Sequence, residues 1–148
     1  MKKFQFPLQK VLEYDTHMQR NEADALGLLL AEYARLEKKR DAMRREYDEA
    51  KRRYQMDCES GQSASRTAAA GLYIADQRQQ LKRIAEQMRE QMRRIDRQRE
   101  RLLEITQDKT MIEKLKEHAK ADYQAAERKS DEMFIAEFVS NQIAKAGG

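Results

Sequence analysis

Two long stretches of this chain carry apolar residues at alternating intervals of three and four positions, and a short polar segment separates them. In the first stretch these positions are Leu26, Leu29, Tyr33, Leu36, Met43, Tyr47, Ala50 and Tyr54. Only Arg40 interrupts the series, which continues less regularly upstream through Leu8 and Leu12. This heptad spacing puts the apolar side chains on one stripe of an α-helix and predicts a coiled-coil seam.

The second stretch carries a similar series, with more polar residues in it. Its seam positions are Ile74, Gln77, Leu81, Ile84, Met88, Gln91, Ile95, Gln98, Leu102, Ile105, Lys109 and Ile112. Glutamine at a seam position costs stability and favours one register over its neighbours. After Ile112 we expect a shift of register that brings Leu115, Ala119, Tyr123 and Ala126 onto the contact face.

The segment between the two stretches has the composition of a turn. Gly61 can adopt the positive φ that ends a helix, and Ser63 or Ser65 can cap the next one. Pro7 suits the first turn of a helix. We therefore expect a single domain over 1–148, with helix one over about 7–58, a turn over about 59–64 and helix two over about 65–145. The fold class is all-α, a long two-helix antiparallel coiled-coil hairpin.

The two expected helices differ in length, about 78 Å against about 120 Å at a rise of ~1.5 Å per residue. Antiparallel pairing from the turn puts Leu8 opposite residue 114, so the chain after about Glu117 forms a C-terminal helix overhang. This overhang holds the densest apolar cluster of the second helix: Tyr123, Met133, Phe134, Ile135, Phe138 and Val139. Such a surface fits insertion into a partner, self-association or fraying, and insertion is favoured.

Several function classes are disfavoured. No apolar run reaches the ~18–20 residues that span a bilayer, and Met1-Lys2-Lys3-Phe4 lacks the apolar stretch of a secretory signal. Cys58 is the only cysteine, so no intrachain disulfide can form, which is compatible with a reducing cytoplasm. His17 and His118 have no second ligand at helical metal spacing, and no phosphate-binding glycine loop is present. We expect a protein that is not an enzyme, with no metal, cofactor or small-molecule substrate.

A basic stretch between Arg89 and Arg101 raises the question of nucleic acid. Arg93, Arg94, Arg97 and Arg101 share one helical face, but Glu90, Glu100 and Glu104 fall on or beside it. The chain holds 30 basic and 26 acidic residues, a small excess for following a phosphate backbone. A solvated helix face is favoured, with no nucleic-acid partner.

Four stretches resemble the FliJ family of flagellar type III export proteins, and the resemblance spans nearly the whole chain. They are Phe4-x-Phe6-Pro7-Leu8-x-x-Val11-Leu12, the turn at Gly61 followed by Leu72-Tyr73-Ile74, Glu113-Lys114-Leu115-Lys116-Glu117, and Glu127-x-x-x-Asp131-Glu132. Their order and spacing carry the match, because each motif alone is common in coiled coils.

The resemblance implies a monomeric cytoplasmic stalk, similar to the central shaft subunit of rotary ATPases and peripherally associated with the membrane export apparatus. Its implied partners are the hexameric export ATPase, the cytoplasmic domain of the export gate, and export chaperones. By position, the ring-binding residues would be Phe4, Phe6, Leu8, Val11, Leu12, Phe134, Ile135 and Phe138. The gate-binding residues would be Met43, Tyr47, Tyr54, Tyr73, Gln77, Gln80 and Ile84. Two alternatives remain, the equivalent stalk of an injectisome and a structural coiled-coil spacer or chaperone that dimerises through the overhang.

Overall fold

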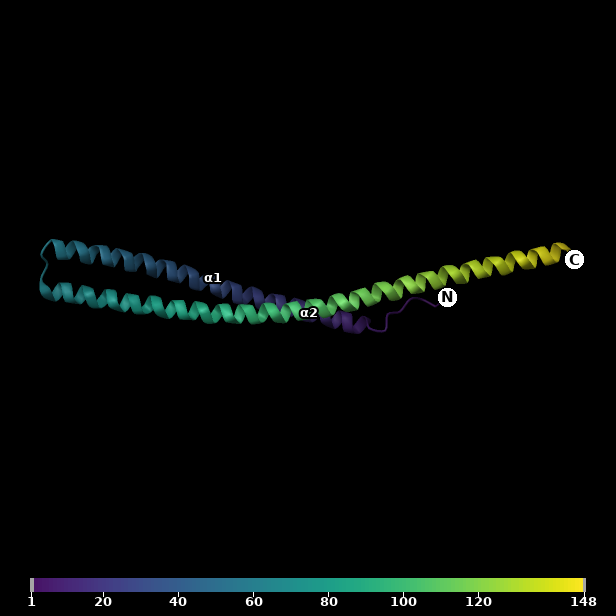
Figure 1. The fold of residues 1–148 in the computed structure, drawn as a ribbon, viewed down its shortest axis with the longest axis horizontal. Helices are drawn as coiled ribbons and strands as arrows, with labels where there is room; N and C mark the ends of the chain where they lie inside the picture. The colour runs from purple at the N-terminus through teal and green to yellow at the C-terminus, as the bar shows by residue number, and fades with distance from the viewer. Residues whose placement is uncertain (1, 148) are drawn as a thin grey trace. The chain divides into compact units, whose positions relative to one another are not determined.

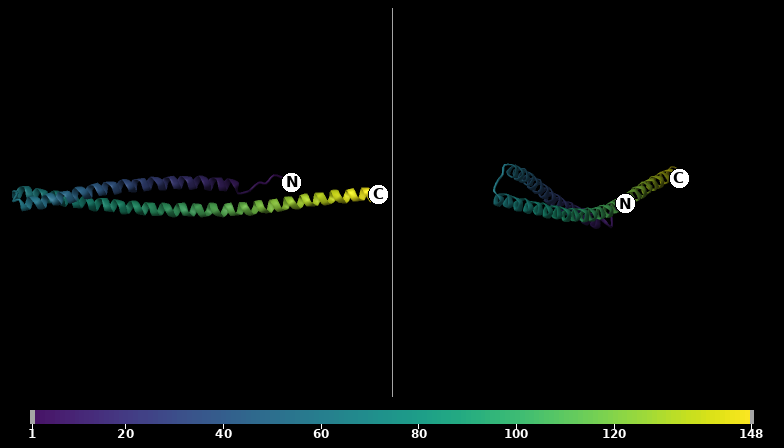
Figure 2. Two further views of the ribbon diagram at one scale, coloured as in Figure 1. Left: turned by 90° about the horizontal axis from the view of Figure 1, so that it is seen from above. Right: turned by 60° about the vertical axis from the view of Figure 1, so that its left-hand side comes forward.

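The computed structural model describes residues 2–147 and contains two helices, α1 (Gln9–Glu59) and α2 (Ala64–Gly147), with no strand in that range. Between residues 22 and 101 the two helices run side by side in opposite directions (Figure 1), as two further views also show (Figure 2). The all-α antiparallel hairpin expected from the two heptad series is confirmed. No described helix has an apolar stretch long enough to cross a membrane.

The turn between the helices depends on one glycine and one serine. Gly61 has φ of 74°, a left-handed conformation that glycine adopts without steric cost, and the Gln62 N–H donates to the Asp57 carbonyl at 3.2 Å. Ser63 then caps α2, because its Oγ accepts from the Arg66 N–H at 3.4 Å. These two residues end one helix and start the next within four positions.

Contacts along the chain divide it into two units, each of which contains a part of both helices. The first, the hairpin unit, is Glu22–Arg101 and includes the turn. The second, the terminal unit, joins Met1–Asn21 to Leu102–Gly148. The two units are described separately below.

The core of the hairpin unit lies on the predicted seam. Its buried apolar residues form two clusters, Leu36 with Ile84 and Met88, and Tyr47 with Ala50 and Ile74. Leu81 packs against both clusters, and further along α2 the side chain of Ile95 is 0% exposed. Every seam position predicted in this unit is buried or half-buried.

Two glutamines interrupt this core as hydrogen-bonded layers. Gln91 and Gln98 are only 5% and 8% exposed. The Gln91 amide donates to the Leu29 carbonyl at 3.0 Å, and the Gln98 amide donates to the Glu22 carbonyl at 3.0 Å and also to the Glu22 carboxylate. The second pair repeats the first one heptad further along both helices. Among the described residues no buried side-chain nitrogen or oxygen lacks a partner, so these layers are satisfied.

The seam of the terminal unit is only half-buried and more polar. Gln19 of α1 donates to the Thr106 hydroxyl at 3.1 Å and accepts from the Lys109 ammonium at 3.0 Å. The predicted register shift after Ile112 is wrong, because Leu115 is 51% exposed. The steps of four and three continue unshifted through the partly buried Lys116, Ala119 and Tyr123, and Ala126 is exposed. A lysine can occupy such a position because its aliphatic stem packs while its ammonium reaches water.

The contact face of α2 extends to Tyr123, beyond the limit near Glu117 that pairing of two helices predicts. The reason is that the chain before α1 is not helical and lies along α2 instead. Extended chain covers about 3.3 Å per residue, against about 1.5 Å in a helix, so a few residues reach further. From Gln124 to Gly147 every residue of α2 is exposed, and this segment is the overhang.

Candidate partner-binding surfaces

The overhang of α2 presents a group of large apolar side chains to solvent. Phe134, Ile135 and Phe138 are 71%, 60% and 57% exposed, and Val139 and Ile143 are exposed beside them. We call these five residues the tip surface. Large apolar side chains gathered on one exposed segment are typical of a surface that another protein covers.

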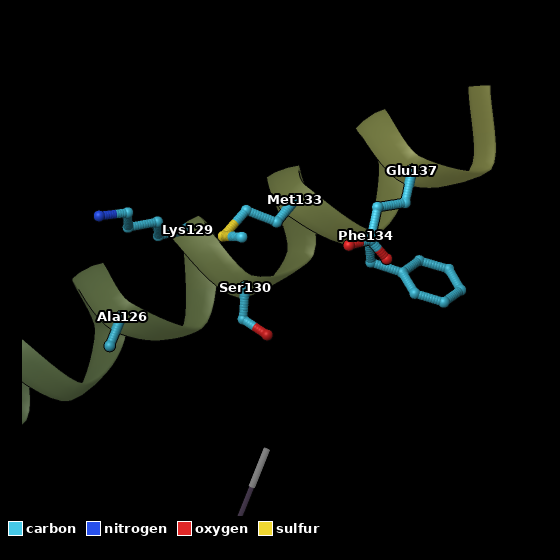
Figure 3. A pocket seen from close by; sticks show the side chains of 6 residues that line it. All are labelled: Ala126, Lys129, Ser130, Met133, Phe134 and Glu137. Carbon is cyan, nitrogen blue, oxygen red and sulfur yellow. The ribbon is translucent and has the colours of Figure 1, made fainter. Parts of the chain in front are cut away.

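The tip surface does not simply continue the seam of the hairpin. At ~100° per residue, Phe134 projects within about 20° of Tyr123, the last seam residue, whereas Ile135 and Val139 project about 120° and 160° away from it. Figure 3 shows Phe134 and Met133 leaving α2 in different directions. Both border a shallow pocket that Ala126 also lines. A partner that only extended the seam would therefore leave Ile135 and Val139 in water.

The segment before α1, which we call the N-terminal arm (residues 2–8), contacts α2 at Tyr123. The Phe4 ring centroid lies 5.4 Å from that of Tyr123 with the planes tilted by 54°, and the Tyr123 hydroxyl donates to the Lys2 carbonyl. An open groove with a volume of about 570 Å³ borders this arm and Lys116. Phe4 therefore already has a contact within the chain.

The residues expected to bind the ring consequently fall on two surfaces of the terminal unit. Phe4, Phe6 and Leu12 are partly buried, whereas Leu8 and Val11 are 38% and 42% exposed. The arm contacts α2 at Tyr123, and Phe134 lies eleven residues further on, roughly 17 Å along the helix axis. The structure does not bring the aromatic residues of the arm together with those of the tip.

The residues expected to bind the gate lie in the hairpin unit with very different exposure. Tyr47 and Ile84 are 8% and 3% exposed and belong to the core, and Met43, Tyr54, Gln77 and Gln80 are partly buried. Only Tyr73, at 44% exposed, presents a large accessible surface. Ile84 can reach a partner only if the seam opens.

Tyr73 is part of a polar cluster that the sequence analysis missed. Its hydroxyl donates to the Glu46 carboxylate at 3.1 Å, which raises the pKa of Tyr73, and Arg53 donates to the same carboxylate at 3.0 Å. These groups border a groove near the turn with a volume of about 410 Å³. One sequence feature could have predicted this cluster. Glu46 and Arg53 carry opposite charges seven positions apart, and each lies next to a seam residue, Tyr47 or Tyr54.

Two other tyrosines near the turn have pKa values shifted by neighbouring side chains. The Arg78 guanidinium donates to the Tyr47 hydroxyl at 3.2 Å and lowers the pKa of Tyr47. The neighbouring Cys58 side chain raises the pKa of Tyr54. Within residues 2–147 no group of three or more His, Cys, Asp or Glu side chains is placed to hold a metal ion, and His17 contacts Asn21.

The fold and these surfaces define a class: an α-helical coiled-coil protein with large apolar residues exposed on its overhang. Residues 4–148 match the family of flagellar FliJ proteins, and the chain belongs to this family. Membership confirms the resemblance carried by the four sequence motifs. It gives the chain a role related to flagellar protein export and an association with components of the export apparatus. No curated protein and no solved structure matches the chain.

Proposed function

We propose that the chain is a non-enzymatic stalk of the flagellar type III export apparatus. In this proposal it inserts into the hexameric export ATPase ring and links the ring to the cytoplasmic domain of the membrane export gate. It works in the cytoplasm as a monomer, peripherally associated with the membrane, and escorts export chaperones. Family membership supports the export role, and the exposed tip surface supports the contact with the ring.

The tip surface is the observation on which the ring contact rests. Phe134, Ile135 and Phe138 are exposed at this helix end. Burying them against a partner would be favourable by about 1.5–3 kcal/mol for each side chain that becomes fully buried. A ring with an apolar inner surface would recover part of this free energy. The charged outer face of the helices would stay hydrated and leave the contact confined to the tip.

A pull-down with the hexameric export ATPase tests the ring contact. Removal of the residues after Asp131, or the triple substitution Phe134→Ser, Ile135→Ser and Phe138→Ser, should abolish retention of the chain while helicity measured by circular dichroism stays high. A matched control replaces Leu28, Leu103 and Met111 by serine, because these side chains are 75%, 56% and 64% exposed but lie outside the overhang. Full retention of the tip variant would overturn the assignment.

The gate contact is assigned to the exposed part of the expected set. Tyr73→Ala should weaken binding to the cytoplasmic domain of the gate and leave binding to the ring unchanged. Leu72→Ala is its control, because Leu72 is adjacent and 74% exposed. Equal losses in the two variants would count against a specific role for Tyr73.

The self-associating spacer is the second candidate, since the same tip surface could bury itself against a second copy. Sedimentation at several concentrations separates the two functions. A monomer over the whole range supports the stalk. A dimer that dissociates in the triple serine variant supports the spacer.

A further inference from the structure

The net positive charge of this chain is concentrated in one segment of α2. Between Arg78 and Arg101 there are nine basic and four acidic residues, whereas the remainder of the chain has 21 basic and 22 acidic residues. The segment lies entirely within the hairpin unit. Apart from this segment the chain is close to neutral.

Four arginines of this segment project from the same side of α2. At ~100° per residue, Arg83, Arg94, Arg97 and Arg101 fall within a sector of about 60°, along roughly 27 Å of the helix. All four side chains are exposed, and we call them the arginine stripe. The stripe lies on the flank of α2, roughly 100° around the helix from the seam residues, and Arg94 borders a groove that Glu32 and Arg35 of α1 also line.

Internal ion pairs neutralise little of this charge. One carboxylate, Glu90, lies 3.6, 3.9 and 3.8 Å from the guanidinium groups of Arg93, Arg94 and Arg97, so three cations share a single anion. In the described part of the chain, Arg83 and Arg101 have no carboxylate within 4.0 Å. Exposed pairs at these distances contribute at most about 1 kcal/mol, which leaves the arginines available to other carboxylates.

We propose that the arginine stripe binds an acidic amphipathic helix of another protein. The arginines are spaced by three, four, seven and eleven residues, which keeps them on one side of α2 where they would flank a third helix packed along it. In coiled coils, opposite charges at such flanking positions decide which helices pair. Guanidinium groups also bind carboxylates in a bidentate geometry that lysine cannot provide.

The acidic residues of the segment favour a polypeptide over nucleic acid or an anionic membrane. Glu86, Glu90, Asp96 and Glu100 alternate with the basic residues on the exposed side of α2. A duplex presents one phosphate per ~1.7 Å of its axis and would repel these carboxylates along the whole contact. A helix can instead place its own basic residue opposite Glu90 and its acidic residues opposite the arginines. This surface is separate from the tip surface and does not depend on the ring contact.

Fluorescence anisotropy with the full chain tests the proposal. The probe is a labelled synthetic helix of three heptads with glutamate on one face, and its reference is the same peptide with glutamine in place of glutamate. The triple variant Arg94→Gln, Arg97→Gln and Arg101→Gln should weaken binding of the glutamate peptide about tenfold or more. The control variant Arg44→Gln, Arg45→Gln and Arg52→Gln removes the same charge from exposed positions of α1 and should change binding less than about twofold.

Binding of the glutamate peptide that exceeds binding of the glutamine peptide, weakens with salt and depends on the stripe supports the proposal. Equal losses in the two triple variants would overturn it, because they would indicate attraction by net charge alone. Absence of peptide binding would overturn it as well. Tighter, stripe-dependent binding of duplex DNA or of vesicles rich in anionic lipid would replace the acidic helix by that partner. Circular dichroism should show the same helicity for both variants, since none of the six arginines belongs to the seam.

Discussion

The hairpin unit and the terminal unit are built from the same two helices with the same heptad spacing, yet they bury very different amounts of side chain. The hairpin unit contains buried apolar residues such as Ile84, Met88 and the fully buried Ile95, whereas no described residue of the terminal unit is buried. The contact face of α2 keeps apolar residues such as Ile105 and Ile112 in the terminal unit, although Lys109 and Lys116 also lie on it. A further difference lies in α1, which has Leu29 and Leu36 at its seam in the hairpin unit and Asp15 and Gln19 in the terminal unit. A heptad series therefore produces a core only where the facing helix carries a matching series.

The largest expected effect is on the apolar core of the hairpin unit. Ile95→Ala should lower the free energy of unfolding by about 2–5 kcal/mol, because it removes a fully buried side chain and leaves a cavity. Ile112→Ala in the half-buried seam of the terminal unit should cost roughly 1 kcal/mol or less. Urea unfolding followed by circular dichroism measures both. Equal losses would show that the two units are packed alike.

A smaller effect of opposite sign is expected for the polar layers. The double substitution Gln91→Leu and Gln98→Leu should raise the free energy of unfolding by about 1–2 kcal/mol, because apolar side chains replace polar ones at buried positions. The Leu29 and Glu22 carbonyls lie within α1 and keep their helical partners. The variant should also form additional species in sedimentation, since neither glutamine layer of the hairpin unit then favours one register. A fall in stability would mean that the glutamine hydrogen bonds contribute more than we infer.

Removing the contact between the N-terminal arm and α2 should change the free energy of unfolding less than replacing the two glutamine layers. Tyr123→Ala removes an aromatic pair of the kind worth about 0.5–1.5 kcal/mol and the hydroxyl that bonds the Lys2 carbonyl. Limited trypsin digestion should then cleave after Lys2 and Lys3 faster than in the unchanged chain, while unfolding of the hairpin unit is unaffected. Tyr14→Ala is the control, because Tyr14 is 62% exposed. Unchanged cleavage in Tyr123→Ala would show that other contacts hold the arm.

The smallest expected effect is on the pKa of Tyr73, near the turn. Glu46→Gln removes the carboxylate that raises the pKa of Tyr73, so this pKa should fall towards its ordinary value of about 10. A raised pKa means that the bond stabilises the fold below pH ~10 and that this contribution is lost as pH rises through the pKa of the folded state. Tyrosinate absorbance during a pH titration measures the change. Glu49→Gln should leave the titration of Tyr73 as it is, and a matching change in that variant would point to net charge as the cause.

The seams could be predicted from the sequence because side-chain direction in a helix repeats with a known period. The apolar residues from Leu26 to Tyr54 and the polar layers at Gln91 and Gln98 follow from that period alone. The course of the chain after Ile112 could not be predicted, because the pattern there offers Leu115 and Lys116 as competing contact positions. The structure places the lysine on the contact face.

Surface contacts between the helices were harder to predict than the seams. The bond between Tyr73 and Glu46 joins residues 27 positions apart, and it depends on the register to within a fraction of a turn. The path of the N-terminal arm was missed for a different reason. Proline at position 7 indicated the start of a helix but not that the preceding residues would lie extended along α2.

The repeated glutamine layers constrain how a protein of this design can change in length. Gln98 pairs with Glu22 and Gln91 with Leu29, so each step of one heptad on α2 corresponds to one heptad on α1 in the reverse direction. An insertion or deletion within one helix of the hairpin unit would misplace every layer on the far side of it. Among relatives, length differences there should come as matched pairs of whole heptads on opposite helices, whereas the overhang is free to lengthen or shorten alone.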